Sequence, residues 1–140
     1  MIVAVDPGRE KCGVAVVAFD GAIEKRLVVP TTVLQEEIFS ILATGKIRVL
    51  LCGDGTGSAA QAAVMRKLAA QHKVQFLIID EKHTTEQARK LYWQQQPPRG
   101  WRRLFPTSMQ TPPVPVDDYV AVLLAWKYLN EERTSHRVTE

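Results

Sequence analysis

The stretch Met1-Ile-Val-Ala-Val-Asp-Pro-Gly8 decides how this fold begins. Its apolar run Ile2–Val5 has the pattern of a buried strand, and the Pro-Gly pair ends that strand. A second apolar run starts at Gly13, so the two runs predict a hairpin with Asp6 at its edge. A carboxylate at the end of a central strand is costly to bury without a partner. Asp6 therefore indicates a site that holds a metal ion or handles phosphate, or else an aspartate that caps the Pro-Gly loop.

The length and composition of the chain are those of a soluble globular protein. Its 140 residues suit a single domain with one substantial core, and 46% of them are hydrophobic and 24% charged. The net charge of +3 permits a polyanionic partner without requiring one. The apolar runs are too short to span a membrane, and the N-terminus lacks the pattern of a signal peptide. We therefore expect no membrane partner.

The two cysteines predict a reducing compartment. Cys12 and Cys52 are not spaced as a Cys-x-x-Cys motif, and Cys52 lies in an apolar run. Two thiols of this kind are typical of structural cysteines in the cytosol, not of a disulfide framework or a metal site. The expected location is therefore cytoplasmic.

Alternating strands and helices are predicted along the rest of the chain. A third strand at Ile23–Pro30 follows the hairpin turn signal Asp20-Gly21. Then come a helix at Thr32–Leu42, a strand at Ile47–Cys52, a helix from Ser58 to about Gln71, a strand at Val74–Ile79, a helix from Thr84 or Thr85 to about Trp93, a proline-rich stretch at 94–116, and a helix from Asp117 or Asp118 to about Glu132. We expect the tail 133–140 to be frayed, and residues 1–132 to form the single domain.

This β-β-β-α-β-α-β-α order predicts an α/β fold. Three hairpin-linked strands are antiparallel, and the strand-helix units that follow favour parallel pairing in the same sheet, with helices on both faces. Sites in such sheets form beyond the ends of the central strands. Acidic residues occur at these places: Asp6, Asp54, Asp80-Glu81 and Asp117-Asp118.

In this element order and in the positions of its acids, the chain resembles the YqgF family, also called RuvX, of the ribonuclease H-like superfamily. Four motifs in order carry the resemblance over nearly the whole chain: Asp6-Pro-Gly8 with Gly13-Val-Ala-Val, Val49-Leu-Leu-Cys-Gly53 with Gly57, Asp80-Glu-Lys-His-Thr-Thr-Glu-Gln-Ala88, and Val116-Asp-Asp118 with Ala121-Val-Leu-Leu. The family is described as Holliday junction resolvases and is implicated in processing precursor 16S ribosomal RNA. The resemblance implies a mixed five-stranded ribonuclease H-like sheet.

The resemblance implies that Asp6, Glu81 and Asp117 are the catalytic acids and hold Mg²⁺ or Mn²⁺. Hard cations prefer carboxylate oxygens, and two of them can activate a water and stabilise a leaving oxygen in phosphodiester hydrolysis. Asp118, in the same helical turn as Asp117, is an alternative ligand. The three histidines are scattered along the sequence and form no transition-metal motif.

Two places depart from the family pattern. Lys82 and His83 stand where the family usually has an arginine and an apolar residue. His83 is a candidate proton shuttle or phosphate contact, or else a surface residue beside a helix. Asp54 lies where the related junction resolvase family RuvC places an essential acid after the equivalent strand. It is a candidate fourth ligand, or else part of a glycine-flanked turn.

A basic and aromatic cluster lies in the proline-rich stretch, between the second and third acids. Arg99, Trp101, Arg102 and Arg103 are its members. Arginines contact phosphate in a bidentate way and a tryptophan can stack on a splayed base, so the cluster predicts a flexible loop that grips the substrate, with Lys82 nearby. The alternative is that Trp101 and Phe105 pack in the core and the arginines are solvated.

The sequence therefore predicts a metal-dependent endonuclease that acts on branched DNA or precursor ribosomal RNA. The alternative function is a nucleic-acid-binding factor in ribosome assembly or transcription that does not cut. Carboxylates that hold metal read neither sugar nor base, so the sequence leaves the choice between DNA and RNA open. It also leaves a monomer or a homodimer open, since symmetric cutting of a four-way junction would favour a two-fold dimer.

Overall fold

A computed structural model of the chain describes residues 1–54, 59–80 and 117–139. For Asp117 and for residues 132–139 it describes the backbone alone. The predicted helix at 84–93 and the proline-rich stretch at 94–116 lie outside the described residues.

A five-stranded mixed sheet forms the centre of the molecule, as predicted. Its strands are β1 (Ile2–Asp6), β2 (Lys11–Val17), β3 (Ile23–Pro30), β4 (Val49–Gly53) and β5 (Gln75–Ile79). Their order across the sheet is β3-β2-β1-β4-β5. The hairpin-linked strands β1, β2 and β3 pair antiparallel, whereas β4 pairs parallel to β1 and β5 parallel to β4. The first strand, β1, therefore lies in the middle of the sheet.

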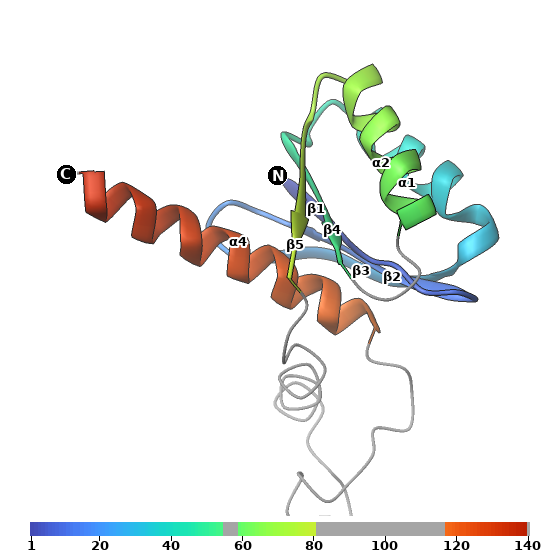
Figure 1. The fold of residues 1–140 in the computed structure, drawn as a ribbon, viewed down its shortest axis with the longest axis horizontal. Coiled ribbons are helices and arrows are strands. Elements are labelled where there is room, and N and C mark those ends of the chain that lie inside the picture. Colours follow the sequence, from blue (N-terminus) through green and yellow to red (C-terminus); the bar gives the residue numbers. More distant parts are fainter. Residues whose placement is uncertain (55–58, 81–116, 140) are drawn as a thin grey trace, which may run out of the picture.

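Helices cover both faces of this sheet (Figure 1). The short 3-10 helix η1 (Thr31–Val33) leads into α1 (Leu34–Leu42), and α1 and α2 (Ala59–Gln71) lie on one face. The long helix α4 (Asp117–Thr139) crosses the other face. Two helix boundaries differ from the predictions: α1 begins at Leu34 because the chain first makes the 3-10 turn, and α4 continues seven residues past Glu132, through the segment expected to be frayed.

Two local signals end the helices on the α1 and α2 face. Gly45 adopts a φ of 74°, and its amide donates to the carbonyl of Leu42 at 3.1 Å, which closes α1. After α2, Lys73 takes the same left-handed conformation, with a φ of 57°, and the Val74 amide donates to the carbonyl of Ala69 at 2.8 Å. Both turns send the chain directly into the next strand region.

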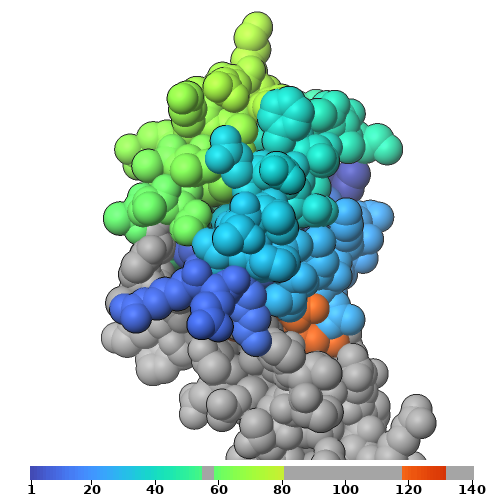
Figure 2. Space-filling view, turned by 90° about the vertical axis from the view of Figure 1, so that its right-hand side faces the viewer, coloured from blue at the N-terminus to red at the C-terminus, as the bar shows by residue number. Residues whose placement is uncertain are grey.

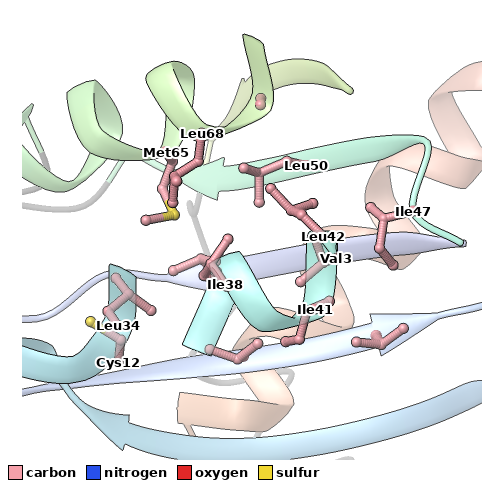
Figure 3. Close-up of a cluster of buried hydrophobic side chains, with 14 of the residues drawn as sticks. Val3, Cys12, Leu34, Ile38, Ile41, Leu42, Ile47, Leu50, Met65 and Leu68 are labelled. Carbon is pink, nitrogen blue, oxygen red and sulfur yellow. The ribbon is translucent and has the colours of Figure 1, made fainter. Parts of the chain in front are cut away.

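Alternation along β1 divides the interior into two cores. Val3 and Val5 pack toward α1 and α2, whereas Ile2 and Ala4 pack toward α4, and all four are fully buried. Figure 3 shows the core on the α1 and α2 side, with Val3, Cys12, Leu34, Ile38, Ile41, Leu42, Ile47, Leu50, Met65 and Leu68 labelled. Since β1 contributes to both cores, the position of its last residue is tightly constrained.

The α4 core is anchored by aromatic side chains. Tyr119 is 1% exposed, and Trp126 donates its indole N–H to the carbonyl of Gly21 at 2.9 Å, in the turn between β2 and β3.

Among the residues that the structure describes, no helix has the length and apolar character needed to cross a lipid bilayer.

Candidate active site

Asp6 ends the central strand on the α4 face of the sheet. Its side chain continues the alternation of Ile2 and Ala4, which pack against α4, and the residue is half-buried. Its partner across the antiparallel pair is Gly13. On the parallel neighbour β4, Cys52 is the partner of Val5, so the next residue of that strand, Gly53, lies beside Asp6. The carboxylate therefore stands between two strand positions that carry no side chain.

Three contacts hold the turn that follows Asp6. The hydroxyl of Thr31 donates to the carbonyl of Gly8 at 2.8 Å, and the Gly8 amide points to the sulfur of Cys12 at 3.4 Å. The Thr31 amide donates to the carbonyl of Glu10 at 2.9 Å. A Cβ atom on Gly8 would collide with the backbone carbonyl of Lys11, so only glycine fits there. The backbone beyond Asp6 is thus tied to the start of η1.

Two further acids follow the parallel strands at the same edge. Asp54 comes directly after β4, and its amide donates to the carbonyl of Ile79 at 3.1 Å. Asp80 comes directly after β5. Because the carboxyl ends of parallel strands meet at one edge of a sheet, both exposed acids share an edge with Asp6. Glu81, the predicted second acid, is the next residue and lies outside the described residues.

The start of α4 comes to this end of the molecule as well. Figure 1 shows the first turn of α4 at the side toward which β1 runs, and Figure 2, which views that side, shows orange atoms of α4 at the same surface. Asp117 is the first residue of the helix, and its side chain is not described.

Asp118, the alternative to Asp117, is engaged in an ion pair. Its Oδ2 lies 3.6 Å from Nη1 of Arg26 on β3, and its side chain is only 15% exposed. The guanidinium of Arg26 also lies over the ring of Tyr119, 3.9 Å from the ring centre. These contacts attach the first turn of α4 to the sheet.

Lys127 connects the middle of α4 to the end of β5. Its Nζ donates to the carbonyl of Asp80 at 2.9 Å. No local sequence pattern marks Arg26, Thr31 or Lys127 as functional residues, because the partner of each is remote in the sequence.

The remaining predicted site residues lie outside the described residues. They are Lys82, His83, Arg99, Trp101, Arg102 and Arg103. In the described part of the chain, no three His, Cys, Asp or Glu side chains are grouped closely enough to hold a metal ion. Two of the three predicted ligands, Glu81 and Asp117, have side chains outside that part. Cys12 and Cys52 are buried, separate thiols.

Comparison with solved structures identifies the fold. The structure of RuvC from Thermus thermophilus matches 91% of this chain and 93% of its own, with a TM-score of 0.56 and 12% sequence identity. This likeness, together with the strand order, confirms the predicted ribonuclease H-like fold. No protein-family model matches the chain. No curated protein sequence matches it either.

Proposed function

We propose that this protein is a divalent-metal-dependent endonuclease of the YqgF or RuvX type that cleaves structured nucleic acid. The observation that carries the proposal is the place of Asp6. It is a half-buried carboxylate at the end of the central strand, between Gly13 and Gly53, at the sheet edge that also carries Asp54 and Asp80. The likeness to RuvC, from the related junction resolvase family, supports the same class of activity.

The chemistry of these residues fits a hard divalent cation. Asp6, Glu81 and Asp117 would hold Mg²⁺ or Mn²⁺ through carboxylate oxygens, and Asp54 is a candidate fourth ligand. When bound, such ions supply an activated water and stabilise the leaving oxygen. The glycines beside Asp6 fit this role because they put no side chain next to the carboxylate on the neighbouring strands.

The protein itself supplies position and substrate contacts. Arg26 neutralises Asp118 and attaches the start of α4, so Asp117 is presented from a fixed helix end. The basic and aromatic cluster Arg99, Trp101, Arg102 and Arg103 is proposed to grip the nucleic acid, together with Lys82. His83 is proposed to contact a phosphate or to move a proton near the scissile bond.

Cleavage by the wild type and by Asp6→Asn tests the proposal. The substrates are a four-way DNA junction, a precursor 16S RNA and unstructured strands, each with Mg²⁺, Mn²⁺ or chelator. We expect metal-dependent cutting that is lost in Asp6→Asn, and the preferred substrate identifies DNA or RNA as the target. Asp20→Asn is the matched control, because Asp20 is exposed in the β2–β3 turn and accepts a hydrogen bond from Ala22 that an asparagine can also accept.

The alternative function has a distinct outcome in the same assay. If neither protein cuts any substrate and both bind nucleic acid equally well, the chain is a binding factor and its acids have a structural role.

We also propose that residues 1–132 form a single nuclease domain that acts as a monomer or a homodimer. Light scattering on the purified chain, alone and with a four-way junction, distinguishes the two states.

A further inference from the structure

We propose that the hairpin loop between β1 and β2, residues 7–10 together with Lys11, is a phosphate-binding surface for the nucleic-acid backbone. Arg9 and Lys11 would be the contacts. The inference rests on the proposed nucleic-acid substrate, but it concerns binding and not the cleavage chemistry. It adds Arg9 and Lys11 to the substrate contacts that the sequence predicted at Lys82, His83 and the 99–103 cluster.

The loop lies next to the proposed reaction centre. Asp6 is the last residue of β1 and Lys11 is the first of β2, so the loop starts at the catalytic carboxylate itself. Figure 2 shows this hairpin, in dark blue, projecting from the end of the molecule that faces the viewer. A phosphodiester held at Asp6 would therefore lie within reach of the long side chains on the loop.

The charged groups of Arg9 and Lys11 have no partner within the described part of the chain. Arg9 and Lys11 are both exposed, and the side chain of neither forms a hydrogen bond or an ion pair with any residue that the structure describes. Other cations are engaged: Lys25 pairs with Glu37 at 3.5 Å, and Arg26 pairs with Asp118. Glu10 lies between Arg9 and Lys11 and removes part of their charge, so the loop remains net positive by one unit.

The backbone of the loop is held in place before any ligand binds. The hydroxyl of Thr31 and the sulfur of Cys12 contact the two backbone polar atoms of Gly8, at 2.8 Å and 3.4 Å. The Thr31 hydroxyl and the Cys12 sulfur are themselves 3.3 Å apart. A preorganised loop loses less conformational entropy when it binds, which increases affinity for the same contacts. Thr31 is thus a positioning residue for Arg9 and Lys11.

The double variant Arg9→Gln/Lys11→Gln tests the phosphate contacts. Binding of the full chain to a labelled four-way junction and to a precursor 16S RNA fragment is measured by fluorescence anisotropy in chelator, over a series of salt concentrations. Each lost phosphate contact lowers the slope of log K against log salt by about 0.7–0.9. Because two contacts are removed, we expect the slope to fall by about 1.4–1.8 and Kd to rise roughly tenfold or more at low salt.

A second double variant controls for net charge. Lys46→Gln/Lys67→Gln removes the same two charges from exposed positions, one preceding β4 near the N-terminus and one on α2. We expect it to change Kd by less than about twofold and to leave the salt slope unchanged. The proposal is overturned if the loop variant binds like the wild type, or if both double variants weaken binding equally.

Thr31→Val tests the preorganisation separately. It removes the hydroxyl that holds Gly8 but keeps both cations, so we expect Kd to rise severalfold with the salt slope unchanged. Thr31→Ser retains the hydroxyl and should bind like the wild type. Equal binding by Thr31→Val and Thr31→Ser would refute the role of Thr31. Binding is measured in chelator, so these results can be interpreted even if the wild type cuts no substrate. Conversely, metal-dependent cutting that is lost in Asp6→Asn would support the nuclease function even if the loop variant binds like the wild type.

Discussion

Arg26 on β3 stacks on Tyr119 of α4, with its guanidinium carbon 3.9 Å from the centre of the tyrosine ring, and it reaches Asp118 from the same position. The contact joins an edge strand to the first turn of the last helix. We therefore expect the two neighbouring aspartates to differ in role, with Asp118 holding the helix on the sheet and Asp117 serving the proposed metal site.

Substitution of the two aspartates should have opposite consequences. We expect Asp117→Asn to lower metal-dependent cleavage by about a hundredfold or more, as loss of a catalytic acid does. Asp118→Asn should retain cleavage within about tenfold but lower the free energy of unfolding by about 1 kcal/mol, or roughly 3 °C in Tm. Cleavage assays and thermal melts measure both. A larger loss of cleavage in Asp118→Asn than in Asp117→Asn would reverse the assignment.

Removal of Arg26 should destabilise the protein through two contacts. Arg26→Met loses the ion pair and the cation-π contact, and it removes the guanidinium from beside the largely buried Asp118. We therefore expect the free energy of unfolding to fall by about 1–2 kcal/mol. Denaturant unfolding of Arg26→Met, Asp118→Asn and the double variant gives the coupling between them. Additive effects in that cycle would show that the pair does not contribute. Lys25→Met serves as the control, since its pair with Glu37 is exposed.

Divalent metal should stabilise the folded protein through Asp6. A ligand that binds only the native state adds about 2.7 kcal/mol at a hundred times its Kd. We expect Mg²⁺ or Mn²⁺ to raise the Tm of the wild type and of Asp20→Asn, and to have little effect on Asp6→Asn. Thermal melts over a metal titration measure this without any substrate. An equal rise in Asp6→Asn would place the metal elsewhere.

Gly8→Ala should impair the site more than an ordinary glycine substitution does. The new Cβ would meet the carbonyl of Lys11, so the turn after Asp6 must shift, and we expect loss of cleavage together with about 1–3 kcal/mol of stability. Gly45→Ala provides the comparison. It places an alanine at a φ of 74° in open space, so it should cost about 1 kcal/mol and leave cleavage intact.

The core between the sheet and α1 should respond to a cavity. Ile38 is fully buried, and Ile38→Ala should cost about 2–5 kcal/mol in denaturant unfolding. Phe39 is the next residue on α1 and is 51% exposed, with an edge contact to His72. Phe39→Ala removes more atoms but should cost less than about 1.5 kcal/mol. A larger cost for Phe39→Ala would contradict the observed packing of α1.

The sequence predicted the strands well because their signals are local. Alternation, continuous apolar runs and the turns at Pro7-Gly8 and Asp20-Gly21 place all five strands within about two residues of the observed ends. The ends of helices depended on more than local pattern. The 3-10 turn before α1 and the extension of α4 to Thr139 were both missed, since a sequence window does not reveal where packing stops supporting a helix.

By itself, the sequence determined the α/β class, the mixed sheet and the place of Asp6 at a strand end. These features depend on apolar runs, on the alternation of side chains along a strand and on turn residues, which are all visible within a few neighbouring positions. Only the tertiary structure decided that Gly13 and Gly53 flank this carboxylate, that Thr31 holds Gly8, and that Arg26 engages Asp118. Each of these contacts joins segments that meet only when the sheet has formed. The physical reason is that strand register and helix docking depend on the whole core, and no short stretch of sequence encodes them.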